Sequence, residues 1–304
     1  MEFDTLLPRS ASAGVLAEVL QIASPARVRA MGVTQHGDHH LQFQVELDVA
    51  AREWQMVTSL GGVYSYRDGT VSLPTWAIHI HGLGSPRAGT LRGVQVATET
   101  GLTSLVVTYR NDGDGPTTGS GRSTLGATEV HDVRAAVRYA LAHGASRVIL
   151  FGWSMGAAIA LQLAADPGLR GIVAGLVLES PVLDWVSTIK ANCKRSGLPA
   201  WTGALAVPWL DNRKMSRVAG LDAPVGLRRF NWITRADELA APTLILHGSA
   251  DTSAPIGVAA RLRDRRPDLV QLERFDADHT MTWNSDPEQW RASVIAALEK
   301  HVGW

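Results

Sequence analysis

One stretch, residues 147–160, constrains the fold of this chain more than any other. It reads RVILFGWSMGAAIA. The run at 148–151 is apolar and rich in β-branched or aromatic residues, which suits a parallel strand that is buried on both faces. The pentapeptide GWSMG follows at 152–156, and the small apolar residues after it favour a closely packed helix. The stretch therefore predicts a strand, a tight turn and a helix, with Ser154 at the turn.

The pattern G-x-S-x-G around Ser154 has a steric explanation. A serine at so sharp a turn is held in a strained backbone conformation. A side chain larger than glycine at Gly152 or Gly156 would collide with the neighbouring strand or helix. The turn lifts the Ser154 hydroxyl above the sheet edge, where the helix N-terminus favours developing negative charge. An ordinary serine between two packing glycines is the alternative, but the flanking strand and helix favour a nucleophile.

The length and charge of the chain narrow the class of protein. A chain of 304 residues can form one large α/β domain, or a domain with an insertion, and can bury a sizeable core. Lysine plus arginine and aspartate plus glutamate each number 29, so no net field favours nucleic acid or an anionic membrane. The single cysteine, Cys193, can form no internal disulfide, which suits a reducing compartment.

The N-terminus and the hydropathy pattern argue against export and membrane insertion. The first ten residues, MEFDTLLPRS, are acidic where a signal peptide would be basic, and Glu18 interrupts the apolar run that follows. No segment approaches the ~20 consecutive apolar residues of a membrane-spanning helix. We therefore expect a cytoplasmic protein with no nucleic-acid or membrane partner, whose oligomeric state the sequence leaves open.

Strand-like and helix-like segments alternate along the chain, which predicts a doubly wound, mostly parallel α/β sheet. Eight segments are strand-like: 28–33, 41–49, 76–80, 104–108, 148–151, 173–179, 242–246 and 269–275. Helices are expected at 10–23, 90–100, 128–142 and 290–301. The first two strands form a hairpin that we expect at one edge of the eight-stranded sheet, whereas 50–74 is expected to be irregular. His36, His39 and His40 at the hairpin turn are expected in a solvated loop and not in a metal site.

The segment 182–241 is several times longer than the dozen or so residues that a parallel crossover needs. It is rich in tryptophan, and prolines interrupt its helical pattern: Trp185, Trp201, Trp209, Trp232, Pro199 and Pro208. We expect a helical lid that rises from the carboxyl edge of the sheet. An elaborated pair of outer packing helices is the alternative. Residues 1–181 and 242–304 would then form the core domain.

A serine nucleophile needs a base that takes its proton and an acid that orients the base. His279 follows the last predicted strand on a loop that could reach Ser154, so we expect it to be the base. His247 lies at a strand end and should form a local hydrogen bond. Asp251 lies in the loop after the penultimate strand, where an orienting carboxylate is expected, and Asp184 is the competing acid.

Two backbone N–H groups must also face the oxyanion that forms during attack on a carbonyl. We expect one to be that of Met155, directly after the nucleophile. The other should come from Leu83, because Gly82 and Gly84 on either side allow the backbone to approach closely. His81 ends a buried strand and is expected to hold this loop in place.

Six motifs occur in an order and at a spacing that resemble those of the α/β-hydrolase superfamily: HGLGSP, YRNDGDGP, GWSMG, LESPVLDW, PTLILHGSAD and DHTMTWN. The resemblance covers the chain from about residue 41 onward. It is greatest to bacterial serine hydrolases that are esterase-like or dipeptidyl-aminopeptidase-like. It implies the α/β-hydrolase fold and a triad of Ser154, Asp251 and His279. The expected helix before Pro25 and the region 50–74 depart from the family pattern.

The leading hypothesis is a serine carboxylesterase that acts on small esters with apolar acyl groups and uses no metal or organic cofactor. The candidate pocket residues are all aromatic: Trp153, Tyr109, Trp201 and Trp209. A thioesterase or an aminopeptidase-like serine peptidase is an alternative. The peptidase would need a carboxylate in the lid for the substrate ammonium: Asp211, Asp222, Asp237 or Glu238. A non-catalytic ligand-binding protein is disfavoured, because a receptor has no need of all three triad residues.

Overall fold

The central element of the fold is a six-stranded parallel sheet with the strand order β12-β11-β10-β9-β7-β8. The computed structural model describes residues 2–6, 28–36, 40–47, 53–57, 63–67, 70–72, 75–112 and 115–302, with side chains for 75–112 and 115–300. The six strands are β7 (Thr75–Ile80), β8 (Thr103–Val107), β9 (Arg147–Trp153), β10 (Val173–Glu179), β11 (Thr243–Gly248) and β12 (Val270–Phe275). They correspond to the last six predicted strands.

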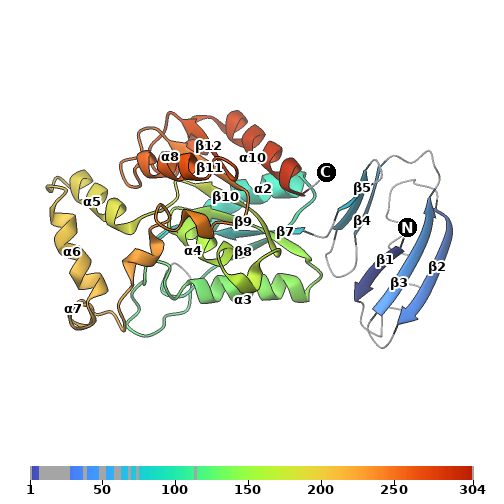
Figure 1. Ribbon diagram of the computed structural model, residues 1–304, viewed down its shortest axis with the longest axis horizontal. Helices are drawn as coiled ribbons and strands as arrows, with labels where there is room; N and C mark the ends of the chain where they lie inside the picture. The colour runs from blue at the N-terminus through green and yellow to red at the C-terminus, as the bar shows by residue number, and fades with distance from the viewer. Residues whose placement is uncertain are drawn as a thin grey trace.

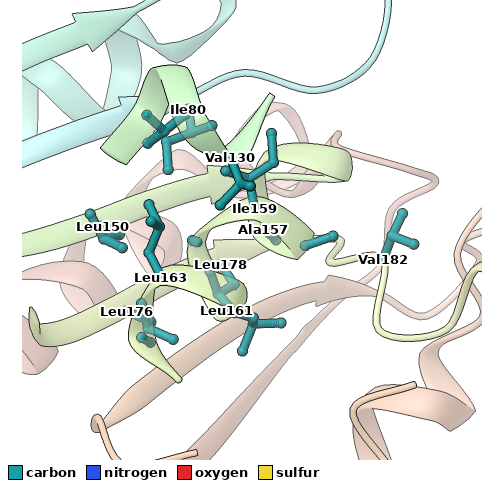
Figure 2. Close-up of a cluster of buried hydrophobic side chains, with 14 of the residues drawn as sticks. Ile80, Val130, Leu150, Ala157, Ile159, Leu161, Leu163, Leu176, Leu178 and Val182 are labelled. Carbon is teal, nitrogen blue, oxygen red and sulfur yellow. The ribbon is translucent and has the colours of Figure 1, made fainter. Parts of the chain in front are cut away.

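Helices cover both faces of this sheet, as the doubly wound prediction requires (Figure 1). One face packs against α3 (Val130–Ala142), α4 (Met155–Ala164) and α8 (Ile256–Arg265). The other face packs against α2 (Leu91–Glu99) and α10 (Pro287–Val302), and the short helix α9 (Thr282–Ser285) precedes α10. Figure 2 shows the first core, where Ile159 and Leu161 of α4 lie among strand residues such as Leu150 and Leu178. Burial of α4 therefore fixes the helix that begins directly after Ser154.

The N-terminal strands form two further sheets, which corrects the prediction of eight strands in one sheet. Strands β1 (Glu2–Leu6), β2 (Val28–His36) and β3 (His40–Leu47) pair antiparallel in the order β1-β3-β2. The hairpin of β2 and β3 is as predicted, but β1 occupies the second edge of β3. An alternating pattern shows that a strand is half-buried, and it does not specify the partner strand.

The region 50–74, which we expected to be irregular, contains an antiparallel sheet of β4 (Glu53–Val57), β5 (Val63–Arg67) and β6 (Thr70–Ser72). The turn signal Asp68-Gly69, which lies between β5 and β6, obscured these short strands in the sequence. The predicted helix at 10–23 and the side chains of His36, His39 and His40 lie outside the described residues.

The segment 182–241 contains three α-helices and two 3-10 turns. It contains α5 (Trp185–Arg195), α6 (Thr202–Asp211), α7 (Arg213–Val218) and the 3-10 turns η3 (Leu227–Phe230) and η4 (Ala236–Glu238). The remaining 3-10 turns are η1 (Arg87–Thr90) and η2 (Pro167–Leu169). Trp185 and Trp232 are buried and anchor the segment, and the Trp232 N–H donates to the Leu183 carbonyl. In the part of the chain that the structure describes, no helix is long and apolar enough to cross a membrane.

His79 on β7 is a buried histidine whose protonation links stability to pH. Its side chain is fully buried, its Nε2 lies 3.1 Å from Ser104 Oγ, and its ring centroid is 4.7 Å from that of Phe151. Burial lowers the pKa of His79 to about 3, because the apolar surroundings penalise the imidazolium.

We expect His79 to make the fold acid-labile. Below about pH 6.5 His79 is protonated in the unfolded chain, whereas in the folded chain it stays neutral down to about pH 3. Lowering the pH between these values therefore favours unfolding. The free energy of unfolding falls by about 1.4 kcal/mol per pH unit in this range, which amounts to roughly 3 kcal/mol at about pH 4.5. Urea unfolding at about pH 7 and pH 4.5 should therefore show a smaller loss for His79→Phe than for the wild type. His131→Phe, at an exposed position of α3, is the matched control. Equal losses in all three proteins would contradict the expectation.

Candidate active site

Ser154 lies between β9 and α4 in a strained backbone conformation. Its φ and ψ are 51° and −111°, a region that residues other than glycine rarely adopt. The Ser154 N–H donates to the Glu179 carbonyl at 3.0 Å. A Cβ added at Gly152 would lie 2.6 Å from Ala157 Cα, and one added at Gly156 would lie 2.0 Å from the Ile80 carbonyl oxygen. The predicted steric reason for these two glycines is therefore confirmed.

The structure brings Ser154, His279 and Asp251 together at the carboxyl ends of the parallel strands. His279 Nε2 lies 2.9 Å from Ser154 Oγ, and His279 Nδ1 lies 2.9 Å from Asp251 Oδ2. Asp251 follows β11 and His279 follows β12, and these strands are neighbours in the sheet. The two ring nitrogens therefore connect a hydroxyl on one side with a carboxylate on the other.

The Asp251 carboxylate is fully buried and well satisfied. Its Oδ1 accepts from the Ser253 and Ala254 N–H groups at 2.9 and 2.7 Å, and His247 Nε2 lies 3.2 Å from Oδ2. Burial alone would raise the pKa of Asp251. The hydrogen bonds from His247, His279 and the Ala254 N–H outweigh it and hold the pKa well below its ordinary value. Asp251 therefore stays ionised in the folded protein and can hold the His279 imidazole.

The competing acid, Asp184, serves a different purpose. Its carboxylate caps α5 by accepting from the Val186 and Ser187 N–H groups at 3.1 and 3.3 Å. The other carboxylate near the base, Asp278, accepts from the Thr252 N–H and from the His279 N–H, both at 2.8 Å. Both carboxylates accept hydrogen bonds from backbone N–H groups and hold local structure. Asp251 is therefore the carboxylate that contacts the imidazole.

The loop after β7 lies directly beside Ser154. A Cβ added at Gly82 would be only 3.2 Å from Ser154 Cβ. The Gly84 N–H donates to both oxygens of Asp112, at 3.0 and 2.9 Å. The Tyr109 hydroxyl donates to the His81 carbonyl at 2.8 Å, and burial, aided by Asp112, raises the pKa of Tyr109. Tyr109 and Asp112 therefore fix the backbone of the loop that contains Gly82, Leu83 and Gly84.

The four aromatic residues predicted to line a pocket lie in three different environments. Tyr109 is fully buried and stacks on His81, with ring centroids 4.2 Å apart. Trp153 is buried in the core beside α2 and α10, and its Nε1 donates to Glu179. Trp201 and Trp209 are 64% and 45% exposed. For Trp153, closeness in sequence to the nucleophile does not determine which face of the sheet its side chain enters.

Glu179 is a residue of the site that sequence reasoning missed. Its side chain is only 1% exposed and accepts four hydrogen bonds, from Trp153 Nε1 (2.8 Å), Trp290 Nε1 (3.2 Å), Arg92 Nη2 (2.9 Å) and the Thr282 N–H (3.3 Å). Arg92 also donates to the Thr280 carbonyl at 3.2 Å. A lone carboxylate at the end of the apolar strand VAGLVLE was the available signal. Among the described side chains, no cluster of His, Cys, Asp and Glu could hold a metal ion.

Three solved structures illustrate the likeness in fold. An esterase from Pyrococcus furiosus is 18% identical, with a TM-score of 0.59 over 97% of this chain and 99% of that chain. A monoacylglycerol lipase from Paleococcus ferrophilus is 19% identical, with a TM-score of 0.53 over 74% and 94%. A thermophilic esterase from Thermogutta terrifontis is 19% identical, with a TM-score of 0.53 over 83% and 100%. At these identities the likeness shows the fold alone.

A search of curated proteins found no match. The sequence model of the alpha/beta hydrolase family matches residues 77–293, which include every strand of the six-stranded sheet except the first two residues of β7. This match covers well over half of the 304 residues. The chain therefore belongs to the alpha/beta hydrolase family.

Proposed function

We propose that this protein is a serine hydrolase that cleaves carboxylic esters of apolar acyl groups through an acyl-enzyme on Ser154. One observation carries the proposal: the His279 ring lies 2.9 Å from Ser154 Oγ through one nitrogen and 2.9 Å from Asp251 through the other. Hydrogen-bond contact from nucleophile to base, and from base to orienting acid, is the geometry that makes a serine hydroxyl reactive.

The proposed reaction has two halves. Ser154 Oγ attacks the ester carbonyl carbon while His279 Nε2 takes the hydroxyl proton, and the carbonyl π electrons move onto oxygen. The tetrahedral intermediate collapses as the C–O bond to the alcohol breaks, and His279 returns the proton to the leaving oxygen. Water then attacks the acyl-enzyme by the same proton path. Asp251 stabilises the imidazolium that forms in each half.

The Leu83 and Met155 N–H groups are the proposed oxyanion donors. Met155 is the first residue of α4, and helix N-termini carry N–H groups without helical acceptors and a partial positive charge. The other loop lies so near Ser154 that a Cβ added at Gly82 would crowd the Ser154 side chain, and the Gly84 N–H already donates to Asp112. Leu83, between these two glycines, is therefore the donor that this loop can offer.

Two contacts of the segment 182–241 with the site support the proposal that it is a lid. The Val182 N–H donates to the Ser154 carbonyl at 3.2 Å, so the segment begins at the nucleophile. In α5, Asn192 Nδ2 donates to Ser253 Oγ at 3.0 Å, two residues after Asp251. The segment therefore contacts both the nucleophile turn and the loop of the acid.

Apolar side chains beside the triad support an apolar acyl group. Leu83 follows Gly82 and is 47% exposed, and Met281 lies two residues after His279 and is also 47% exposed. The carboxylates that an aminopeptidase would offer to a substrate ammonium are mostly engaged. Asp211 accepts from Leu227, Asp222 from Ser120, and Glu238 from Arg235. We therefore favour a neutral ester over an aminoacyl amide.

Replacing the nucleophile tests the proposal directly. Ser154→Ala should lower ester hydrolysis by roughly three to six orders of magnitude, because no acyl-enzyme can form. The variant should fold, since alanine keeps the Cβ and loses one hydroxyl. Labelling with a fluorophosphonate probe measures the reactivity of the nucleophile, and circular dichroism measures whether the variant is folded. Ser196→Ala, at an exposed position, is the control and should label fully. A folded Ser154→Ala protein that still labels and turns over would refute the proposal.

The two candidate acids can be separated by amide substitutions. Asp251→Asn should reduce kcat/KM by up to about four orders of magnitude, because the imidazole loses the carboxylate that fixes its tautomer. Asp184→Asn should have little effect, since asparagine also caps helices well. The comparison is made on one ester at saturating and subsaturating concentrations. The reverse order of the two effects would make Asp184 the acid.

The acyl preference is tested with a panel of nitrophenyl esters of increasing chain length. Each pair of added methylenes should raise kcat/KM by roughly ten-fold until the site is full, at ~0.8 kcal/mol per buried CH₂. Leu83→Ser keeps the backbone N–H and should flatten this dependence, and Leu91→Ser, on the exposed face of α2, should not. Faster turnover of thioesters or aminoacyl amides than of every ester would contradict the ester assignment and favour those alternatives.

A further inference from the structure

Helix α6 has one packed face and one open face. Gly203 is buried, and a Cβ added there would lie 2.9 Å from Lys190 Cα, so this side of α6 rests on the backbone of α5. Trp201, Leu205 and Trp209 recur every fourth residue and form a single stripe. They are 64%, 61% and 45% exposed, although they are among the largest apolar side chains. The stripe therefore points away from the helix on which α6 packs.

Positive charge is concentrated in the segment that carries this stripe. Residues 187–218, which we call the helical tip, contain six exposed cations: Lys190, Lys194, Arg195, Arg213, Lys214 and Arg217. The one acid in the range is Asp211, whose carboxylate accepts from the Leu227 N–H at 2.7 Å. The tip thus has a net charge of +5 in a chain whose net charge is zero. Within the described residues, none of the six cations takes part in an ion pair or a side-chain hydrogen bond.

The tip also projects from the core. Figure 1 shows α5, α6 and α7 together at one end of the molecule, with α6 and α7 on the outer side, away from the six-stranded sheet. Leu198, in the connection between α5 and α6, is 52% exposed and lies three residues before Trp201. The stripe on α6 and the three cations of α7, Arg213, Lys214 and Arg217, therefore share the outer end of the molecule.

We propose that the helical tip docks on an anionic lipid surface. Tryptophan has an apolar body and one N–H group, which suits the boundary between headgroups and acyl chains. Exposed lysine and arginine are attracted to anionic headgroups, and the attraction is strongest when they flank an apolar helix face. The expectation of no membrane partner rests on the zero net charge of the whole chain, and this average conceals the charged tip.

A second copy of the chain fits the tip less well. In a twofold dimer the same patch meets itself, so the cations of both tips would be brought together. Like charges placed opposite each other at an interface cost binding free energy and suppress association. An anionic surface instead attracts the cations of the tip. The charge of the tip therefore favours a membrane as the occupant.

Vesicle co-sedimentation tests this proposal on the full-length protein. The wild type should bind vesicles of phosphatidylcholine with about a quarter phosphatidylserine at least ten-fold more strongly than vesicles of phosphatidylcholine alone. About 0.5 M salt should remove most of this preference, because it screens the attraction. Equal binding to both vesicle types, or no binding to either, would overturn the proposal.

Two variants separate the apolar and the electrostatic contributions. Trp201→Ser/Trp209→Ser should reduce binding at least ten-fold, and Arg213→Gln/Lys214→Gln/Arg217→Gln should remove the preference for anionic vesicles. The matched controls are Tyr139→Ser, an exposed aromatic on α3, and Arg261→Gln/Arg265→Gln on α8, and both should bind as the wild type does. Circular dichroism and thermal unfolding confirm that each variant is folded. Wild-type binding by both tip variants would overturn the proposal.

Two further measurements separate docking through the tip from lipid binding at Ser154 and from self-association. Ser154→Ala should bind vesicles as the wild type does, which keeps this test independent of the proposed hydrolysis. A loss of binding in that variant would place the lipid contact at Ser154 and overturn docking through the tip. Size-exclusion chromatography with light scattering measures self-association. A dimer that Trp201→Ser/Trp209→Ser converts to a monomer would identify a second copy as the occupant and also overturn the proposal.

Discussion

The buried carboxylate of Glu179 is the interaction on which the geometry of the site depends. Its side chain accepts from Trp153, which adjoins the nucleophile, and from Thr282, which follows the base. Arg92 neutralises the carboxylate and donates to the Thr280 carbonyl as well. An unpaired charge at this depth would be costly, but a hydrogen-bonded ion pair offsets that cost. The turn of Ser154 and the loop of His279 thus share one anchor.

This anchoring explains how a strained residue persists at the centre of the site. The Ser154 N–H donates to the Glu179 carbonyl, and the Ser154 carbonyl accepts from the Val182 N–H. Gly152 and Gly156 leave no free space around the turn. A strained conformation survives only where the surrounding structure determines it in several independent ways. Both backbone groups of Ser154 are fixed, so its hydroxyl meets His279 in the free protein.

Much of this arrangement could be predicted from the sequence, because it follows from local chemistry repeated along the chain. The strand, turn and helix around Ser154 are specified by residues within a few positions of each other. The pairing of strands far apart in sequence is not specified by nearby residues. The predicted place of the β2–β3 hairpin in the main sheet is therefore wrong. Glu179 escaped notice for a related reason: its donors come from β9, α2, α9 and α10, far apart in sequence. Trp201 and Trp209 are in a helical segment as predicted, but composition alone does not show which side of a helix faces solvent.

The core and the helical tip obey different physical constraints. Around Ser154 the backbone is packed so closely that a single carbon added at Gly156 would overlap a carbonyl oxygen. The exposed stripe on α6 is not constrained in this way, because exposed side chains can be substituted without displacing a neighbour. An exposed tryptophan there is not required by packing, and large apolar groups in water carry a free-energy cost. The two regions meet where Asn192 of α5 donates to Ser253 beside Asp251. Through this hydrogen bond the helix that supports α6 also supports the loop of the acid.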